Sequence, residues 1–438
     1  MIRLERILAE IEGSDPVARY GRVTDVVGIL AEGKGIREAV GSVCEILPAN
    51  GGKAISAEVV GFRRGSTLLM PIGSLAGVLP GSRIRSRNSS ATVPVGAGLL
   101  GRVLDGLGQP IDGKGPVETA SERPLHAEAP HPLTRMRIRK PLDLGVRAIN
   151  GFATVGKGQR MGIFAGSGVG KSILLGMIAR HTSADVNVVA LIGERGREVR
   201  EFIEKDLVED ALARSVVIVS TSDQPAVQRI RAAYLATAIA EHFRDEGKDV
   251  LLMMDSVTRF AMALREVGLA AGEPPATKGY TPSVFSTLPR LLERAGTSSS
   301  GSITGIYTVL VEGDDLNEPV SDTARSILDG HITLSRSLAS RNHYPAIDVL
   351  QSTSRVMRDI VTPEQVLLAG KAREVIANYR EAEDMIHIGA YVRGSDPKID
   401  FALERFGPLT EFLCQRPDER ESIAESFRKL GEALQGKG

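Results

Sequence analysis

Residues 165–172 read Ala-Gly-Ser-Gly-Val-Gly-Lys-Ser and decide the fold of the central part of the chain. They follow an apolar segment, 160–165, that we expect to be a strand, and they open a segment, 171–181, with helical spacing. Small residues let backbone N–H groups curl around phosphate oxygens, and the N-terminus of the next helix adds a positive dipole end. The pattern therefore predicts a phosphate-binding loop made of Gly166, Ser167, Gly168, Val169, Gly170, Lys171 and Ser172.

Two side chains of this loop have predicted roles toward a nucleoside triphosphate. Lys171 should reach the β- and γ-phosphates, and the Ser172 hydroxyl should ligate Mg²⁺. The usual pattern has glycine where this chain has Ala165. One added β-carbon is a small change, so we expect nucleotide binding to persist. The alternative is a chance Gly-rich turn, which the strand before the loop and the helix after it disfavour.

Acidic residues follow two further apolar segments. The segment 250–255 reads as a buried strand, which would place Asp255 beside the phosphate loop, holding Mg²⁺ through water. The segment 186–192 reads as another buried strand, which we place next to the phosphate loop in the sheet. Glu194, which follows it, is the candidate for orienting and polarising the attacking water. A solvated loop of mixed charge is the alternative for residues 193–198.

Patterning along the rest of the chain predicts four parts. Residues 1–18 have the spacing of a short amphipathic helical arm, which either packs on its own domain or docks a partner or a membrane surface. Residues 19–95 contain short β-type runs between Gly, Asn and Ser clusters, which predict a small barrel, with a sandwich as the alternative. The runs are 20–29, 41–47, 54–62, 67–71, 82–86 and 92–95.

The remaining two parts differ in their periodicity. Residues 96–361 form one predicted domain: 96–150 is an irregular approach rich in turn signals, and from about 150 strand and helix patterns alternate, which predicts an α/β domain with a mostly parallel sheet. Residues 362–438 have helical periodicity with charged faces, which predicts a C-terminal helical domain.

The composition disfavours several classes of protein. Lys and Arg together number 54 among 438 residues, as do Asp and Glu, so net charge gives no general attraction for nucleic acid or an anionic membrane. Aromatic residues make up 4%, which disfavours a base-stacking RNA or DNA translocase. We expect Cys44 and Cys414 to be reduced thiols rather than a disulfide or metal site. No signal peptide or bilayer-spanning apolar run is visible, so we expect a cytosolic protein.

Six segments carry a specific resemblance to a known family. They read Gly-Glu-Arg-Gly-Arg-Glu-Val (193–199), Asp-Ser-Val-Thr-Arg-Phe-Ala (255–261), Gly-Glu-Pro-Pro-Ala-Thr-Lys-Gly-Tyr (272–280), Val-Glu-Gly-Asp-Asp-Leu-Asn-Glu-Pro (311–319), Leu-Asp-Gly-His-Ile-Thr-Leu-Ser-Arg (328–336) and Tyr-Pro-Ala-Ile-Asp-Val-Leu-Gln-Ser-Thr-Ser-Arg (344–355). The chain resembles the rotary-type ATPases from about Tyr20 onward, and within them it is most similar to the ATPases of flagellar and other type III protein-export systems. Ala165 and Ser172 match the flagellar branch, since the ATP synthase catalytic subunit usually has Gly and Thr there.

The resemblance implies a P-loop (RecA-like) fold and a homo-hexameric ring with nucleotide at the subunit boundaries. Arg355 would then reach into the neighbouring subunit's site as an arginine finger, an element worth about 10³–10⁵ in rate. Tyr344 matches the family's adenine-stacking tyrosine, and residues 412–415 would help to close the adenine pocket. Arg195 and Arg259 match arginines near the γ-phosphate.

The acidic loop 312–318 also has two interpretations. It is either an exposed acidic turn or, as the resemblance implies, part of the central opening of the ring. Its acidic residues are Glu312, Asp314, Asp315 and Glu318.

The function that the resemblance implies is Mg²⁺-dependent ATP hydrolysis that energises flagellar or type III protein export, by releasing cargo from chaperones and delivering it to the export gate. The implied partners are a stator-like regulator on the N-terminal arm, a coiled-coil central stalk protein, export chaperones with cargo and the membrane export gate. The implied location is cytoplasmic, with peripheral association with the inner membrane at the export apparatus. The alternatives are a catalytic-type subunit of a rotary ATP synthase, an injectisome secretion ATPase and a ring subunit that binds nucleotide without hydrolysis, which the presence of Glu194 disfavours.

Overall fold

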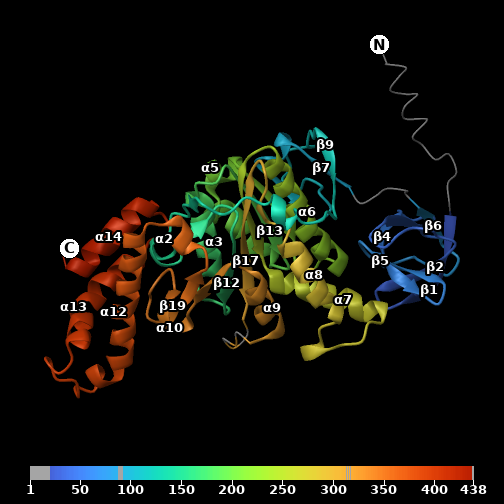
Figure 1. Cartoon of the computed structure of the whole chain (residues 1–438). Coiled ribbons are helices and arrows are strands. Elements are labelled where there is room, and N and C mark those ends of the chain that lie inside the picture. Colours follow the sequence, from blue (N-terminus) through green and yellow to red (C-terminus); the bar gives the residue numbers. More distant parts are fainter. Residues whose placement is uncertain (1–19, 87–91, 312, 314, 316, 437–438) are drawn as a thin grey trace, which may run out of the picture. The chain divides into compact units, whose positions relative to one another are not determined.

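The computed structural model describes residues 20–86, 92–311, 313, 315 and 317–436, which form two compact units (Figure 1). The first unit consists mainly of residues up to 92, and the second contains most of the rest. The predicted arm 1–18 lies outside the described residues.

The first unit is a closed antiparallel barrel, which confirms the prediction from the β-type runs. Its core includes Val23, Cys44, Ile46 and Val59, all of them buried. Around the barrel the strands are β1 (Tyr20–Val27), β2 (Leu30–Lys34), β5 (Ser66–Pro71), β4 (Ile55–Arg63), β3 (Val43–Leu47) and β6 (Arg83–Ser86).

Two of the predicted β-type runs behave differently from expectation. The run 20–29 ends in a hairpin turn, because Gly28 has a positive φ of 59° and β2 folds back antiparallel on β1. The run 92–95 forms β7 (Thr92–Val95), which pairs with β9 (Ser121–Pro124) in a separate two-stranded sheet. It cannot join the barrel, because β6 already pairs with both β1 and β3 and leaves no open edge.

The second unit is built on a mostly parallel sheet, as predicted. The strands 160–165, 186–192 and 249–255 are buried along nearly their whole length, as expected of parallel strands that are covered on both faces. Only the edge strand β19 and the short β16 (Gly296–Thr297) pair antiparallel among the strands described in this sheet. The order is β19 (Ile347–Ser354), β18 (Gly330–Leu334), β12 (Arg160–Ala165), β17 (Ser302–Leu310), β15 (Asp249–Asp255), β13 (Val186–Ile192), β14 (Ser215–Ser220) and β8 (Arg102–Asp105).

Helices alternate with these strands along the chain. A π-helical turn, Phe202–Asp206, separates α4 from α5, and a small hairpin joins β10 (Pro141–Leu142) to β11 (Val155–Gly156). The helices up to residue 360 are α2 (Arg147–Phe152), α3 (Lys171–His181), α4 (Gly196–Glu201), α5 (Val208–Ala213), α6 (Ala226–Asp245), α7 (Val257–Ala271), α8 (Pro282–Leu292), α9 (Pro319–Ile327), α10 (Arg336–Ser340) and α11 (Met357–Ile360).

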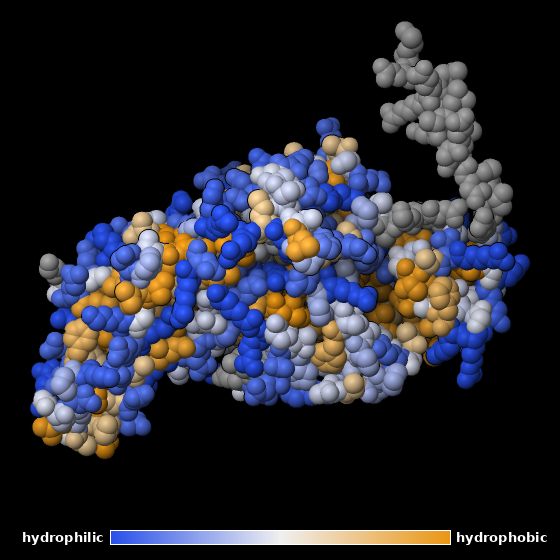
Figure 2. All heavy atoms as spheres, viewed as in Figure 1, coloured by the Kyte–Doolittle hydropathy of each residue, from blue (hydrophilic) through white to orange (hydrophobic). Residues whose placement is uncertain are grey.

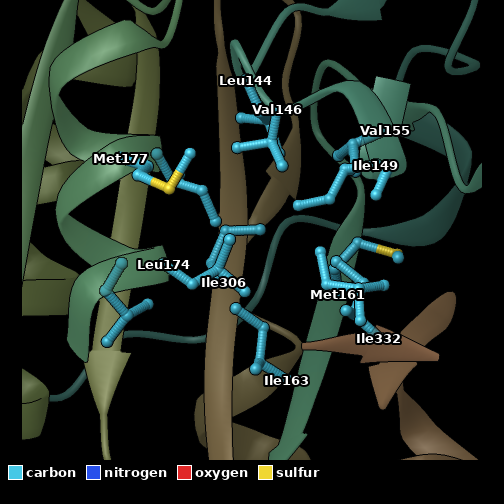
Figure 3. Packing of buried hydrophobic residues seen from close by; sticks show 14 of the residues in the cluster. Leu144, Val146, Ile149, Val155, Met161, Ile163, Leu174, Met177, Ile306 and Ile332 are labelled. Atoms are coloured by element: carbon cyan, nitrogen blue, oxygen red, sulfur yellow. The ribbon is translucent and has the colours of Figure 1, made fainter. Parts of the chain in front are cut away.

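Close packing of α3 on the sheet positions the phosphate loop. Figure 3 shows Leu174 and Met177 of α3 beside Ile306 of β17, with Ile163 of β12 in the same cluster. All four side chains are at most 1% exposed. Such dense packing leaves little freedom for the start of α3 relative to the end of β12, so the loop between them is held at both ends.

Three helices complete the chain, which confirms the prediction of a helical C-terminal region. They are α12 (Pro363–His387), α13 (Pro397–Leu413) and α14 (Ile423–Gln435). Thr362 and Gln365 form a capping box at the start of α12, and the rings of Tyr379 and Phe406 stack at 3.6 Å between α12 and α13.

Hydrophilic residues cover most of the face that Figure 2 shows, with hydrophobic residues interspersed. In the C-terminal helical region, Leu367 of the helix 363–387 is 73% exposed, and Ile388 and Val392, which follow that helix, are 77% and 71% exposed. Among the described residues, no helix is both long and apolar enough to cross a membrane.

Both cysteines are free thiols, as the sequence predicted. Cys44 lies in the barrel core, where burial raises the pKa of its thiol to about 11. Cys414 follows α13 and is half-buried. A thiol with so high a pKa is a weak nucleophile, so Cys44 is structural rather than reactive.

A buried ion pair joins α6 to the segment after α8. Arg294 donates to both Glu241 carboxylate oxygens, at 2.8 and 2.7 Å, and also to the Leu125 carbonyl at 2.8 Å. Each of the two paired side chains is only 2% exposed.

Replacement of Glu241 by alanine is expected to lower the free energy of unfolding by about 3–5 kcal/mol, because it leaves the Arg294 charge buried without a counter-ion. Urea unfolding followed by circular dichroism measures this. The matched control is Glu204→Ala, because Glu204 is 57% exposed and its partner Arg200 is 79% exposed, so this pair should contribute less than about 1 kcal/mol. Equal losses in the two variants would contradict the expected effect of burial.

Candidate nucleotide-binding site

The phosphate loop takes the predicted position between β12 and α3. Gly168 and Gly170 have positive φ angles of 79° and 88°, and Gly170 is the N-cap of α3. Such angles favour glycine and turn the backbone so that α3 starts at Lys171. The side chain of Val169 points away from the cavity and into the core, and the residue is 1% exposed. Any contact of Val169 with a ligand would therefore come from its backbone.

Ala165 fits this loop because it is the last residue of β12. It pairs with Leu310 of β17 and Leu334 of β18, and its carbonyl accepts a 3.0 Å hydrogen bond from the Val311 N–H. Its backbone is therefore extended, and an extended residue carries a β-carbon without strain. The position needs no glycine in this chain.

A cavity of about 1030 Å³ opens over the loop. Residues from the ends of several strands and from the starts of the following helices line it, as in other open parallel sheets. Among the predicted site residues, those that line it are Gly166, Ser167, Gly168, Gly170, Lys171, Ser172, Glu194, Arg195, Arg259 and Tyr344.

The ammonium group of Lys171 joins the two predicted acidic residues. Its Nζ lies 3.1 Å from Glu194 Oε1 and also donates a hydrogen bond to Asp255 Oδ1. Burial opposes the charged ammonium, but Asp255 and Glu194 outweigh it, so the pKa of Lys171 is raised above its ordinary value. The lysine therefore keeps its charge, which is the form that binds phosphate.

Asp255 ends β15 and is held in place from the neighbouring strand. Its Oδ1 accepts a 2.7 Å hydrogen bond from the Thr308 hydroxyl of β17, and the residue is 4% exposed. The carboxylate is therefore oriented by both Thr308 and Lys171.

Glu194 follows β13, but the prediction that β13 lies next to the phosphate loop in the sheet was wrong. β17 and β15 separate β13 from β12 in the sheet, so β13 is not next to the strand that carries the phosphate loop. Glu194 still meets Lys171, because the carboxyl ends of parallel strands lie along one edge of the sheet.

The turn after β13 explains how Glu194 enters the cavity. Gly193 has a φ of 70°, and a β-carbon there would lie 2.8 Å from the Arg259 β-carbon, so only glycine lets the turn approach α7 this closely. Burial raises the pKa of the Glu194 carboxyl, a hydrogen bond with Glu198 acts in the same direction, and Lys171 opposes both. A carboxylate with a raised pKa is a better proton acceptor than an ordinary glutamate.

The predicted arginines and the tyrosine lie at different places around the cavity. The Arg195 side chain is 82% exposed and pairs with Glu198 at 3.4 Å. Arg259 belongs to α7, and its buried Nε has no hydrogen-bond partner among the described residues. The Tyr344 ring borders the loop, since a β-carbon on Gly170 would lie 3.3 Å from Tyr344 Cε1.

Arg355 is the one predicted site arginine that does not line this cavity. It is exposed just after β19, and its Nη2 donates to the Arg325 carbonyl at 3.5 Å. Residues 412–415 do not line the cavity either. The Phe412 ring lies 6.4 Å from that of Phe152, and the Gln415 side chain binds the Arg147 N–H and the Gly145 carbonyl.

The acidic loop is described in part. Glu312 and Asp314 lie outside the described residues. Asp315 Oδ2 lies 3.6 Å from Lys278 Nζ. Glu318 lines the cavity and also caps α9 by accepting hydrogen bonds from two backbone N–H groups.

Several cavity residues were missed in the sequence. Thr258, Met262 and Arg265 line the cavity together with Arg259, on one face of α7. Their spacing is that of a helix face, but the sequence does not show which face meets the cavity. Ala165, which belongs to the predicted phosphate-holding segment 165–172, also lines it. The other lining residues without a predicted role at this site are Ile173, Gly193, Glu198, Ser222, Lys278, Tyr280, Leu310, Val311, Gly313, Glu318 and Arg336.

The oxygen donors here suit a hard cation. The exposed Ser172 hydroxyl and the Asp255 carboxylate are both oxygen ligands, which Mg²⁺ prefers. Within the described part of the chain, no group of three or more His, Cys, Asp or Glu side chains is arranged to hold a metal. The donor set therefore fits Mg²⁺, which commonly keeps several waters and takes further ligands from substrate phosphates.

Comparisons with known proteins agree with this geometry. Residues 145–354 match the family described as ATP synthase alpha/beta family, nucleotide-binding domain, and residues 361–432 match the T3SS EscN ATPase C-terminal domain. The chain is 53% identical to the flagellum-specific ATP synthase of Bacillus subtilis, with 98% of each chain covered. It is 52% identical to the type 3 secretion system ATPase of Xanthomonas euvesicatoria, with 98% of this chain and 96% of that protein covered.

Solved structures give the same result. The assembled ATPase EscN of the enteropathogenic E. coli type III secretion system matches with a TM-score of 0.90 and 46% identity, over 94% of this chain and 100% of that one. EscN in complex with its central stalk EscO matches with a TM-score of 0.87 and 45% identity, over 94% and 100%.

Proposed function

Because this chain belongs to the family of flagellum-specific ATP synthases and type 3 secretion system ATPases, we propose that its hydrolysis of ATP energises protein export through a flagellar or type III apparatus. The observation that carries the proposal is the position of Lys171, at the start of α3 and paired with both Glu194 and Asp255. A phosphate-binding lysine and a candidate water-activating carboxylate thus line the cavity, and the candidate metal-holding carboxylate Asp255 lies buried directly behind them.

Lys171 and the loop backbone bind the triphosphate in this proposal. The N–H groups of residues 166–170 surround the phosphates, and Lys171 turns from the carboxylates toward the β- and γ-phosphates. Glu194 is then free to orient and polarise the attacking water. Arg195 and Arg259 stabilise the charge that develops on the γ-phosphate.

Ser172 and Asp255 would hold Mg²⁺ in this proposal, the serine as a ligand and the aspartate acting through water. Bound Mg²⁺ neutralises phosphate charge during cleavage. Asp255 is suited to an indirect role, because it is buried and already accepts hydrogen bonds from Thr308 and Lys171.

Arg355 acts on a neighbouring subunit in this proposal, within a ring of six copies. Two observations support it: Arg355 is exposed, and it does not line the cavity of its own chain. EscN was solved as an assembled ATPase, which supports contact between copies of such a chain.

Tyr344 stacks on the adenine of the bound nucleotide. Tyr344→Ala is expected to weaken ATP binding by about tenfold to a hundredfold, since base–aromatic stacking contributes about 1–3 kcal/mol. Titration with a fluorescent ATP analogue measures this. Tyr344→Phe is the matched control, because it keeps the ring and should bind nearly as wild type does. If alanine bound as tightly as phenylalanine, Tyr344 would have no stacking role.

The wider assembly follows from the same family. A coiled-coil central stalk is the first partner, by analogy with EscO on EscN. A stator-like regulator on the 1–18 arm, export chaperones with cargo, a membrane export gate and peripheral association with the inner membrane complete the proposal. The division at residues 18, 95 and 361 into arm, barrel, ATPase domain and helical domain also remains a proposal.

A catalytic-type subunit of a rotary ATP synthase is not favoured. The C-terminal residues 361–432 match the secretion-ATPase domain, and the relatives compared above are flagellar and type 3 secretion proteins. Identity to the flagellar relative and to the secretion relative is nearly equal, at 53% and 52%, so the proposal covers both kinds of apparatus.

Complementation tests the export function. In a strain that lacks the gene, the wild-type chain should restore secretion of export substrates into the medium, and Lys171→Ala should not. Lys248→Ala is the matched control, because Lys248 is exposed and does not line the cavity. Full secretion with Lys171→Ala would show that export does not depend on this site.

A further inference from the structure

We propose that the cavity contains a second oxyanion subsite, formed by Arg265 and Lys278 and separate from the phosphate loop. Its ligand class is a tetrahedral oxyanion such as inorganic phosphate. The identification of that ligand with the phosphate cleaved from ATP rests on the proposed function, and the existence of the subsite does not.

The first step is the spacing of cations along α7. Thr258, Arg259, Met262 and Arg265 line the cavity, so one face of α7 borders it. Arg259 lies against Gly193, at the end of the cavity where Glu194 and Lys171 meet. Arg265 comes six residues later, which is a rise of about 9 Å along a helix. A second positive charge therefore lies well beyond the one that adjoins the catalytic carboxylate.

The second step is that Arg265 is held in place. Its guanidinium carbon lies 5.6 Å from the centroid of the Tyr280 ring, and Tyr280 is 4% exposed. A β-carbon on Gly279 would lie 3.7 Å from Arg265 Nη2, so the guanidinium borders the turn that carries Lys278. In the described part of the chain, Arg265 forms no ion pair. Among the described residues it is therefore a half-buried charge without a carboxylate partner, which favours binding of an anion.

The third step is the adjoining lysine. Lys278 also lines the cavity, and its side chain is 54% exposed. Its pair with Asp315, at 3.6 Å and half-exposed, is of the kind that contributes little. Lys278 can therefore leave Asp315 for an anion at small cost. A planar guanidinium fork and a mobile ammonium together suit the several oxygens of a phosphate.

The charges of the residues that line the cavity also support an anion subsite. Among the described residues, six cationic side chains line the cavity against three acidic ones, Glu194, Glu198 and Glu318. Lys171 is paired with Glu194 and Asp255, and Glu318 is occupied as the cap of α9. Among the described lining residues, Arg265 has no ion-pair partner, so positive charge extends beyond the phosphate loop to the Arg265 end of the cavity.

Phosphate binding in a chain without the loop lysine tests the subsite. In full-length Lys171→Ala, titration calorimetry with inorganic phosphate is expected to show one site per chain. Adding Lys278→Gln or Arg265→Gln should weaken that binding by about tenfold, the effect of losing one charge-assisted contact. Lys278→Arg should keep it, because the charge remains. Lys248→Gln is the matched control and should change nothing.

Two results would overturn the subsite. One is absence of phosphate binding in Lys171→Ala. The other is a phosphate affinity that neither Lys278→Gln nor Arg265→Gln changes. If these variants impaired ring assembly but not phosphate binding, the two cations would contact a carboxylate of a neighbouring copy and would not form the subsite. ATP hydrolysis by the wild-type chain is measured in parallel. Phosphate binding that depends on Lys278, together with no ATP hydrolysis, would support the subsite and contradict the proposed function.

Discussion

Glu194→Gln is expected to lower kcat for ATP hydrolysis by about 10²–10⁴ while leaving ATP binding nearly intact. The amide keeps the size of the side chain but cannot accept a proton from water. Binding should persist because the phosphate loop and Lys171 are unchanged. Steady-state phosphate release and ATP-analogue titration measure the two effects separately.

The pH dependence gives the same variant a second readout. Burial raises the pKa of the Glu194 carboxyl, and catalysis needs its deprotonated form. In the wild type, kcat should therefore fall as pH decreases through that raised pKa, at a higher pH than an ordinary glutamate would give. Glu194→Gln should lack this limb of the profile.

Glu201→Gln is the control for both measurements. Glu201 belongs to the same segment, on α4, but its side chain is 40% exposed, pairs with Arg197 and does not line the cavity. Its kcat and pH profile should match the wild type. If Glu194→Gln hydrolysed ATP at the control rate, another group would have to activate the water.

Mixing two inactive variants is expected to restore part of the ATPase rate. Lys171→Ala removes the phosphate-binding ammonium, and Arg355→Ala removes the finger, a loss of about 10³–10⁵ in rate for such an arginine. Each variant alone should be nearly inactive. In mixed rings some boundaries combine an intact loop with an intact finger, and those boundaries should hydrolyse ATP.

The mixture needs a measurement of assembly beside the rate. Light scattering or electron microscopy should show rings for both single variants and for the mixture. Arg358→Ala is the matched control for Arg355→Ala, because Arg358 is also exposed and also lies outside the cavity lining. Confirmed mixed rings without recovery would contradict a role of Arg355 across the boundary.

Local sequence patterns predicted most of the elements that carry the site. The strands 160–165 and 186–192 were predicted at the bounds that the structure gives them, and Lys171 was placed correctly at the start of a helix. These elements are set by short-range signals: apolar runs, a Gly-rich turn and helical spacing. The meeting of Lys171, Glu194 and Asp255 was also predictable, because parallel strands bring their carboxyl ends to one edge.

Features that depend on distant pairing were not predictable in the same way. The sheet order, with β17 and β15 between β12 and β13, arises from residues far apart in the chain. The hairpin at Gly28 was not predicted, because residues 20–29 have the composition of one continuous strand and the positive φ of Gly28 cannot be inferred from it. Arg265 and Lys278 were missed for a similar reason, since no local pattern shows that the turn at Gly279 approaches Arg265.

Magnesium-dependent ATP hydrolysis by the purified full-length chain tests the central claim most directly. With Mg²⁺, the wild type should release phosphate from ATP, Lys171→Ala should be nearly inactive, and Lys248→Ala should match the wild type. Chelation of Mg²⁺ should abolish the wild-type rate. An assembled wild-type protein that neither binds nor hydrolyses ATP with Mg²⁺, or a Lys171→Ala variant as active as the wild type, would contradict the account.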